Sequence, residues 1–488
     1  MPQPPVFDNS YARLPAQFFH RQHAESVPAP SLIRINTPLC TQLGIDKTWL
    51  ESSAGLDMLS GRAFPDSADP IATVYAGFQF GSWNPQLGDG RALLIGEIVA
   101  PDGHRYDIQL KGSGRTPYSR GGDGKSPLGP VLREYLVSEA MHALGVPTSR
   151  ALGAVTTGDT VYRDNALPGA ILTRVASSHI RVGTAQFFAS RDDRQALSAL
   201  CDHVIARHYP HAADSANPVQ AMLNAVIGAQ ANLIAQWQGL GFIHGVMNTD
   251  NMLLCGETID YGPCAFMESY DPATVFSSID HGGRYAYGNQ PHIAHWNLAG
   301  LAQAVLPLLH TDEDEAVKIA QSEVNAFPER FVAAYQKVLA NKLGLSDFTD
   351  SDDELLKDFL TLLKQEKADF TLAFRRLAER ASGRELVKTL WDFPSSFSDW
   401  LQRWDERIAR DSQSSESRAA QMQRANPLYI PRNHRVEEAI NAAYKGDFSP
   451  FNQLLEVIGQ PFDDRGEWLD YARPAAPEEA VCQTFCGT

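Results

Sequence analysis

The stretch GFIHGVMNTDNMLL, Gly241 to Leu254, decides the fold. His244 and Asn251 stand 7 positions apart in it (251 − 244), Asp250 directly precedes Asn251, and Asp260 follows in IDYG. Amide and carboxylate oxygens are the ligands that hard divalent cations prefer in proteins. Asn251 and Asp260 are therefore candidate metal ligands on two neighbouring loops.

The spacing of His244 and Asn251 is that of the protein-kinase catalytic loop, His-Arg-Asp-x-x-x-x-Asn, in which the Asp accepts the proton of the substrate hydroxyl. Here the position two after the histidine is Val246, and a valine cannot accept a proton. His244 itself is expected to pack the loop. A turn-rich loop with ordinary capping residues would produce a similar pattern, so the assignment depends on further features.

The composition restricts the class of partner. The chain has 488 residues, 43% of them hydrophobic, and its 42 basic and 58 acidic side chains give a net charge of −16. The length predicts about three domains or one large two-lobed core with extensions. The negative charge argues against a nucleic-acid or anionic-membrane partner, so any phosphate site is expected to be a local basic pocket.

The sequence shows neither the pattern of a membrane span nor that of a signal peptide. No run of about 18 apolar residues is present, and residues 1–30 lack the apolar core of a signal peptide. We therefore expect a cytoplasmic protein that does not span a membrane.

A β-hairpin is predicted upstream of the kinase-like loop. RALLIGEIVA and HRYDIQLK flank the turn signal at 101–103, Pro-Asp-Gly. In the second strand the apolar residues alternate with polar ones, which places Lys111 on the polar face. The preceding segment GSWNPQLGDGR contains Gly88 and Gly90, and its glycines would let the backbone approach a ligand closely. A strand lysine by itself more often faces solvent than a phosphate.

The next segment, SPLGPVLREYLVSEAMHALGV, carries the apolar stripe of a helix. A carboxylate on this helix would orient Lys111, and both Glu134 and Glu139 are candidates. Glu139 lies inside the apolar stripe, where an unpaired carboxylate is costly, and Glu134 lies off it. Periodicity alone therefore selects Glu139.

The pattern of elements predicts an α+β, protein-kinase-like, two-lobed fold, because the lysine strand, the glutamate helix and the Asn/Asp loops follow in the kinase order. MLLCGETIDYG is expected to form two short strands around residues 255–257, and residues 410–424 a solvated linker or a helix without a cap. We predict four regions: an N-terminal extension (1–70), a small α+β nucleotide-binding lobe (71–176), a helical large lobe with the catalytic and metal loops (177–310), and a long helical C-terminal extension with a cysteine-containing tail (311–488).

Nearly the whole chain resembles the selenoprotein O (SelO) family, protein adenylyltransferases with a protein-kinase-like fold. The resemblance rests on long segments in the same order: FDNSYARLP, YAGFQFGSWNPQLGDGRALLIGE, QLKGSGRTPYSRGGDGKS, LREYLVSEAMHALGVPTSRALG, GFIHGVMNTDNMLLCGETIDYGP, IDHGGRYAYGNQP and NPLYIPRNHRVEEAI.

The resemblance implies a role for each candidate residue. Lys111 resembles the nucleotide lysine, and Glu134 in LREYL resembles its helical partner, against the choice from periodicity. Asn251 and Asp260 resemble ligands of Mg²⁺ or Mn²⁺, and Asp250 resembles the proton acceptor. The other positions implied in ATP binding, in addition to Asp260, are Gly88, Gly90, Arg91, Asp123, Gly124, Arg174 and Arg181.

The implied activity is transfer of AMP from ATP to Ser, Thr or Tyr hydroxyls of protein substrates, with release of pyrophosphate. In the family ATP is turned end for end relative to kinases, so that the γ-phosphate points into the small lobe. Arg174 and Arg181, assisted by Lys111, would then stabilise the leaving pyrophosphate. Two alternatives stay open: an ordinary phosphotransferase, and an inactive nucleotide-binding pseudokinase scaffold, which Val246 favours.

The cysteines suggest a separate, regulatory hypothesis. Six cysteines in this length do not form a disulfide framework, but VCQTFCGT places Cys482 and Cys486 at the end of the sequence. Cys486 stands where the resemblance implies a selenocysteine or cysteine, which suggests a thiol redox partner or a regulatory disulfide. DPATVFSSIDHGG contains no cysteine, so Cys264 is the candidate near the metal aspartate.

Overall fold

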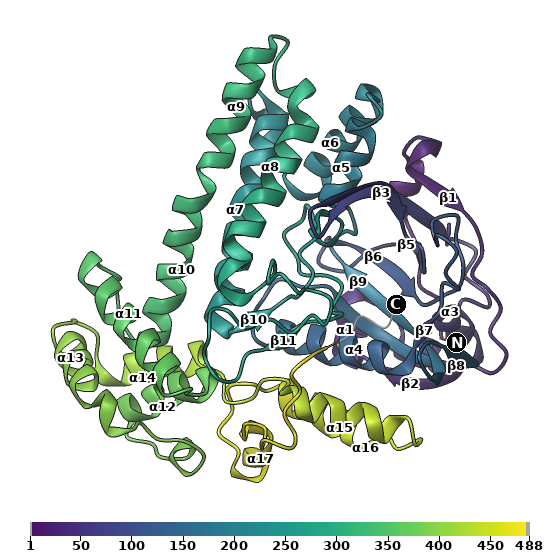
Figure 1. Cartoon of the computed structure of the whole chain (residues 1–488). Coiled ribbons are helices and arrows are strands. Elements are labelled where there is room, and N and C mark those ends of the chain that lie inside the picture. Colours follow the sequence, from purple (N-terminus) through teal and green to yellow (C-terminus); the bar gives the residue numbers. More distant parts are fainter. Residues whose placement is uncertain (1, 485–488) are drawn as a thin grey trace.

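The computed structural model describes residues 2–484 and combines an antiparallel β-sheet with a large helical region (Figure 1). The expected mixture of helices and strands is confirmed. The strands are β1 (Phe19–Arg21), β2 (Ser31–Ile35), β3 (Ile71–Gln79), β4 (Ser82–Gly88), β5 (Ala92–Val99), β6 (Arg105–Lys111), β7 (Ser126–Pro127), β8 (Arg150–Tyr162), β9 (Ala166–Ala176), β10 (Phe242–Ile243) and β11 (Ala265–Phe266).

The helices occupy most of the chain after β9. They are α1 (Thr37–Leu43), α2 (Lys47–Leu50), α3 (Ser53–Ser60), α4 (Leu128–Ala143), α5 (Val182–Ala189), α6 (Arg194–His208), α7 (Pro218–Leu240), α8 (Gln290–Leu309), α9 (Glu313–Asn325), α10 (Phe327–Leu343), α11 (Asp350–Gln365), α12 (Phe370–Ser382), α13 (Ser398–Ala409), α14 (Ser415–Ala425), α15 (Asn433–Ala443), α16 (Ser449–Ile458) and α17 (Leu469–Ala472). None of the helices in the described part of the chain has the length and apolar character needed to cross a membrane.

The main sheet has nine strands within residues 2–484. Seven follow the order β1-β3-β5-β6-β9-β8-β2, while β4 pairs with β3 and β7 with β9. The predicted hairpin is confirmed as β5 and β6, with Ala92 opposite Lys111. Strands β1 and β2 come from the first 70 residues and pair with β3 and β8, so the N-terminal segment also builds the sheet. The division into four regions stays a prediction.

The two faces of the sheet have different partners, as β6 shows. Ile108 and Leu110 pack into an apolar core with α1, α2 and α3. The alternate residues, Asp107, Gln109 and Lys111, face the other way and are buried there, Lys111 being only 8% exposed. The alternation is as predicted, but the polar face is covered by protein. Its charged groups therefore need partners inside the structure.

Helix α4 crosses this second face and is covered on two sides. One side packs on β8 and β9, and the other on α15 and α16, which return from the far end of the sequence (Figure 1). A helix covered on two sides is apolar around most of its circumference. The stripe seen in the sequence is therefore a poor guide to which glutamate of α4 faces Lys111.

The kinase-like loop follows directly after helix α7. The first turn of α7 is capped by Asn217, whose Oδ1 accepts from the backbone N–H of Gln220 at 3.1 Å, and the helix ends at Gly241 with φ 70°. Asn directly before Pro and a final Gly are typical start and stop signals of a helix, and both are visible in the sequence. After the loop, β10 pairs with β11.

The two strands expected around residues 255–257 are absent from the described structure, and that prediction is wrong. The two arms of this turn pair with different segments instead of each other. Leu253 bridges to Arg181, and Thr258 bridges to Thr148. Each arm therefore ties the loop to a segment that precedes it by many residues.

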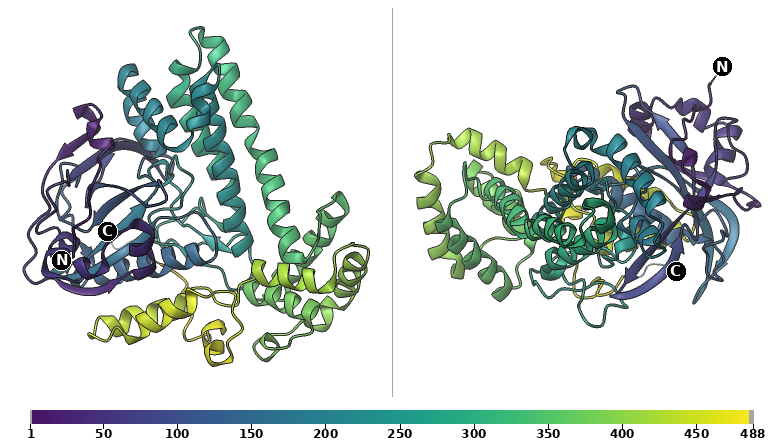
Figure 2. Two further views of the ribbon diagram at one scale, coloured as in Figure 1. Left: turned by 180° about the vertical axis from the view of Figure 1, so that it is seen from behind. Right: turned by 90° about the horizontal axis from the view of Figure 1, so that it is seen from above.

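Helices α11 to α14 form a second apolar core with α10, at the end of the molecule opposite the sheet (Figures 1 and 2). The prediction of a linker or capless helix at 410–424 is wrong. Helix α14 is capped by Ser414, whose side chain accepts from the N–H of Ser417 at 3.2 Å. Arg418 and Met422 of this helix are buried, so tertiary packing orders a segment whose composition is that of a solvated one.

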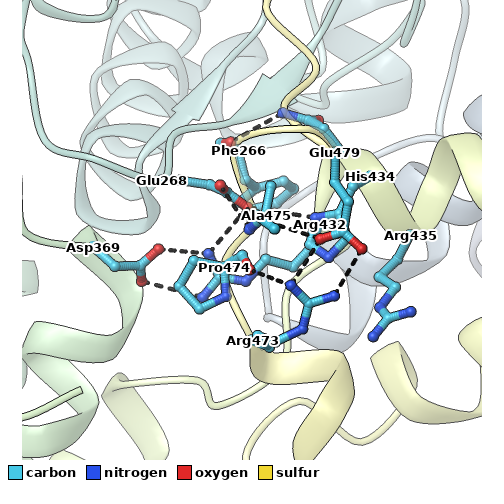
Figure 3. Close-up of polar contacts among 12 residues, drawn as sticks. Phe266, Glu268, Asp369, Arg432, His434, Arg435, Arg473, Pro474, Ala475 and Glu479 are labelled. Atoms are coloured by element: carbon cyan, nitrogen blue, oxygen red, sulfur yellow. Dashed lines mark hydrogen bonds and ion pairs between the residues drawn. The ribbon is translucent and has the colours of Figure 1, made fainter. Parts of the chain in front are cut away.

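A polar network centred on the buried pair Arg432–Asp369, drawn in Figure 3, fixes the C-terminal segment to the helical region. Arg432 donates to Asp369 at 2.5 and 3.1 Å and to Glu268 at 3.3 Å. Arg473 donates to Glu479 at 2.7 and 2.9 Å, and the backbone N–H of residue 475 reaches Glu268 at 3.2 Å. We call Arg432, Asp369, Glu268, Arg473 and Glu479 the Arg432 clasp.

Candidate active site

A cavity of about 340 Å³ lies between the second face of the sheet and the loops after α7. This volume is within the range of small-molecule sites. Every site residue predicted from the sequence lines it, except Glu134: Gly88, Gly90, Arg91, Lys111, Asp123, Gly124, Arg174, Arg181, Asp250, Asn251 and Asp260. These residues span more than 170 positions of the chain, and the fold brings them to one place.

Lys111 is paired with a glutamate of α4, and that glutamate is Glu134. Lys111 Nζ lies 2.6 Å from Glu134 Oε2. Glu139, the choice from periodicity, is wrong because its carboxylate has other partners. It accepts from Arg150 at 2.9 and 2.7 Å and from Asn36 at 2.8 Å. Glu139 therefore ties α4 to the start of β8 and to the residue before α1.

Three cationic side chains bind the carboxylate of Asp260. Its carboxylate accepts from Lys111 at 3.0 Å, from Arg181 at 2.9 Å and from Arg174. Burial by itself would raise the pKa of Asp260, but Arg174, Lys111 and Arg181 outweigh it and hold that pKa well below its usual range. Arg174 also bonds Glu134. We call Lys111, Glu134, Arg174, Arg181 and Asp260 the Asp260 cluster.

The backbone at Asp260 is strained. Its φ of 61° is in the left-handed region, which costs a residue with a side chain roughly 1 kcal/mol or more. Strain of this kind persists only where surrounding contacts impose it. Here the three cations hold the side chain, so the conformation aims the carboxylate at the cationic groups of the sheet.

Both arginines are buried, so neither has the surface role that an isolated arginine usually has. Arg174 lies on β9, and Arg181 directly precedes α5. Arg181 lies over the ring of Tyr75, 4.7 Å from its centroid, and its Nη1 donates to the carbonyl oxygen of Asp250 at 2.6 Å. Its Nη2 is 3.9 Å from Asp89. The guanidinium is therefore held in a fixed position at the wall of the cavity.

Asp250 is enclosed by the β3–β4 hairpin and is 7% exposed. Gln79 Nε2 donates to its Oδ2 at 3.1 Å, while its Oδ1 is buried without a hydrogen-bond partner among the described residues. A side chain at Gly77 would place a Cβ 2.7 Å from Oδ1, so only glycine leaves room there. Burial raises the pKa of Asp250 to about 6, against the attraction of Arg181.

The kinase-like loop is packed by His244, as expected. Its Nε2 donates to the carbonyl oxygen of Ile259 at 2.8 Å, and its ring stacks on Trp237. Burial lowers the pKa of His244, which keeps the ring neutral. Val246 lines the cavity, and its carbonyl oxygen accepts from Asn251 Nδ2 at 3.0 Å. The amide oxygen of Asn251 therefore remains as the group able to hold a cation.

Two glycine-rich segments, around Gly88 and around Gly124, also line the cavity. A Cβ at Gly88, where φ is 146°, would lie 2.5 Å from the ring of Tyr118, and one at Gly124 would meet backbone atoms at 2.1 Å. Asp123 accepts from Arg163 at 2.8 and 3.0 Å, which braces its loop. Close packing of this kind brings the backbone of both loops to the cavity.

Sequence reasoning missed several residues at the cavity: Gln79, Asp89, Tyr118 and Arg163. Gln79 and Asp89 stand in a segment used for the family resemblance, YAGFQFGSWNPQLGDGRALLIGE, but neither residue type by itself indicates a role. Arg163 follows β8 and has no local signal at all. Only the folded chain brings it to Asp123, 40 positions earlier.

Comparison with known proteins agrees with this geometry. A sequence model of a family described as protein adenylyltransferase SelO matches residues 5–459. The chain belongs to the SelO family. A SelO-family relative from Rhodopseudomonas palustris, named protein nucleotidyltransferase YdiU, is 58% identical over 486 residues, covering 99% of both chains. Proteins of the same name from Methylorubrum populi and Bradyrhizobium diazoefficiens are 56% and 54% identical, again over 99% of each chain.

These findings confirm the resemblance and the enzyme class expected from it. The chain is a nucleotidyltransferase of the SelO family.

Proposed function

We propose that the protein transfers AMP from ATP to Ser, Thr or Tyr hydroxyls of protein substrates and releases pyrophosphate. The observation that carries the proposal is the Asp260 cluster, in which three cations lie together at one wall of a cavity of ligand size. Family membership supports the same reaction. A protein-kinase-like, two-lobed fold is part of the proposal, supported by the Lys111–Glu134 pair between a strand and α4.

ATP would bind with its terminal phosphates toward the sheet. Lys111 and Arg174 come from β6 and β9, so cationic groups suited to a triphosphate tail are on that side. The leaving pyrophosphate carries more charge than the phosphoryl group that a kinase transfers. Fixed donors in a site of low dielectric stabilise such charge strongly, and losing one of them costs on the order of 3 kcal/mol.

Asp250 is the proposed proton acceptor for the attacking hydroxyl. It stands on the loop after α7, between Asn248 and Asn251 at the cavity wall, and the α-phosphorus would lie beside it in this orientation of ATP. A carboxylate whose pKa is raised to about 6 is still ionised near neutral pH and is a stronger base than an ordinary aspartate. Asp250 therefore supplies the function that Val246 cannot.

Asn251 and Asp260 would hold Mg²⁺ or Mn²⁺. Both present oxygen donors to the cavity, which fits a hard divalent cation. Residues 2–484 contain no cluster of three or more His, Cys, Asp or Glu residues suited to a metal, so phosphate oxygens of ATP would complete the coordination. When bound, the ion supplies positive charge to the phosphate groups.

ATP labelled separately at the α and γ positions tests the reaction. Incubation with a protein acceptor should transfer the α label, and Asp250→Asn should greatly reduce the transfer. Transfer of the γ label instead would make the protein a phosphotransferase. No labelled protein with either nucleotide would support the inactive scaffold.

Redox control by the tail is a separate part of the proposal. Thr484 donates its hydroxyl to the carbonyl oxygen of Pro263 at 2.7 Å, next to Cys264, and Cys482 is an exposed free thiol. Cys486 lies outside the described residues. Counting thiols before and after mild oxidation tests this part: a loss of two thiols supports a disulfide, and an unchanged count removes it.

A further inference from the structure

A second cavity, of about 320 Å³, lies where several helices end. Its wall includes Leu144 after α4, Leu240 at the end of α7, Lys342 in the last turn of α10 and Ala425 at the end of α14. It shares no lining residue with the nucleotide cavity. It is therefore a separate site, and no step of the proposed reaction uses it.

Its charged lining residues are all cations: Lys337, Lys342 and Arg424. None of the three forms an ion pair with any residue in the described part of the chain, and no Asp or Glu lines the cavity. This is unusual in a chain with a net charge of −16, where acidic partners are abundant. A concave surface lined by one sign of charge concentrates ligands of the opposite sign.

Lys342 lines the cavity and is only 3% exposed. Its Nζ has one acceptor among the described residues, the carbonyl oxygen of Ala425 at 3.5 Å, and lies 4.4 Å from the ring centroid of Phe374. Burial lowers the pKa of Lys342 to about 7. A buried ammonium without a carboxylate is costly, and an anion brought into the cavity would remove much of that cost.

The helix ends do not neutralise the cations. The carbonyl ends of α4, α7, α10 and α14 each carry roughly half a negative charge, so together they offset about two of the three positive charges. The remaining charge favours an anion. The rest of the wall is apolar at Val338, Leu240 and Phe462, and the amide of Gln236 adds a neutral hydrogen-bonding group.

We propose that this cavity binds a small organic anion. A carboxylate or phosphate group of the ligand contacts Lys342, with Lys337 and Arg424 at the rim, and the apolar body of the ligand lies against Val338, Leu240 and Phe462. The two anionic groups share the chemistry that the site requires, since both accept charge-assisted hydrogen bonds from lysine and arginine.

Binding of 4-fluorobenzoate and of 4-fluorophenyl phosphate to the full chain, followed by fluorine NMR, tests the proposal. Lys342→Met should weaken binding of the preferred probe by on the order of tenfold, the effect of one charge-assisted hydrogen bond. Lys111→Met, in the nucleotide cavity, should leave that affinity unchanged. The probe that binds more tightly identifies the anionic group.

A rim variant covers the case in which Lys342→Met does not fold. Arg424 is exposed, so Arg424→Gln should fold normally and weaken binding by about threefold, while Lys445→Gln, an exposed lysine outside the cavity, should have no effect. The proposal is overturned if both probes bind more weakly than about 1 mM. It is also overturned if Lys111→Met abolishes binding while Arg424→Gln leaves it intact.

Discussion

The Asp260 cluster and the Arg432 clasp are both built around a buried arginine bound to a carboxylate, and the cluster lines a cavity of ligand size. In the clasp the Arg432 side chain is fully buried and Asp369 is 5% exposed. In the cluster the Asp260 side chain is 22% exposed and lines the nucleotide cavity, where it accepts from three cations. In the clasp the Arg432–Asp369 pair is closed by protein, while the outer members Glu268, Arg473 and Glu479 are 24–36% exposed. The Asp260 cluster has a face available to a ligand.

Arginine–carboxylate pairs therefore have two roles in this protein: one set stabilises the fold, and the other forms the candidate active site. A closed ion pair contributes to folding because each charge, once buried, depends on its partner. In the open cluster each cation has more than one acceptor, so removing one leaves the remaining charges paired. We expect changes in the clasp to alter stability and changes in the cluster to alter catalysis.

The largest effect on stability should come from Arg432→Met. The substitution leaves the buried carboxylate of Asp369 without its charged partner, which should lower the free energy of unfolding by about 3–5 kcal/mol. Urea denaturation measures the loss. The matched control is Arg403→Met, whose partner Asp358 is nearly half exposed and whose removal should cost less than about 1 kcal/mol. Equal losses in the two variants would show that the clasp is not closed.

The corresponding change in the cluster is Lys111→Met. The rate of α-label transfer should fall on the order of 100-fold, because a cation at the leaving pyrophosphate is lost. The unfolding free energy should change little, since Glu134 and Asp260 keep their bonds to Arg174. A large loss of stability with an unchanged transfer rate would contradict the distinction between the two networks.

Two glutamates of α4, Glu134 and Glu139, should differ in their effects on rate and on stability. Glu134→Gln should lower the transfer rate by about tenfold, because a charge-assisted hydrogen bond that orients Lys111 is weakened. Glu139→Gln should leave the rate unchanged and lower stability by about 1–3 kcal/mol, since it removes the partner of Arg150. Initial rates and urea midpoints of both variants provide the test; the reverse pattern would assign the nucleotide role to Glu139.

The smallest expected effect is a pH dependence of the stability, caused by His434 beside the clasp. Burial and the neighbouring Arg435 lower the pKa of His434 to about 4, although Glu479 and Glu268, the latter at 3.7 Å, favour the charged ring. The unfolded chain, with an ordinary histidine pKa, therefore binds more protons than the folded one between about pH 6.5 and 4. Stability should fall as the pH decreases through this window.

His434→Phe tests that dependence. The variant should show a shallower fall of the unfolding free energy between pH 7.5 and 5, by less than about 1.4 kcal/mol per pH unit, the limit for one proton. His104→Phe, at an exposed turn, is the control and should retain the slope of the parent protein. An unchanged slope in His434→Phe would mean that His434 titrates normally in the folded state.

Signals in the sequence predict much of the fold and many of the residues that line the candidate active site. The β5–β6 hairpin follows from alternation and a turn signal, and α7 from its cap and its final glycine. Lys111, Asn251 and Asp260 were found because strand period, loop spacing and long family-like segments are all visible in the linear chain. Backbone preferences and chemical residue types act over a few positions, so they can be read without the fold.

Tertiary structure alone decided which groups meet. Helix α4 is packed on both sides, so its apolar stripe could not distinguish Glu134 from Glu139, and the choice depended on Arg150 occupying Glu139. Arg432 and Glu268 are 164 positions apart in the chain, and no local pattern links them. The physical reason is that a charge pair depends on distance in space and on exclusion of water, and both exist only after distant segments have packed together.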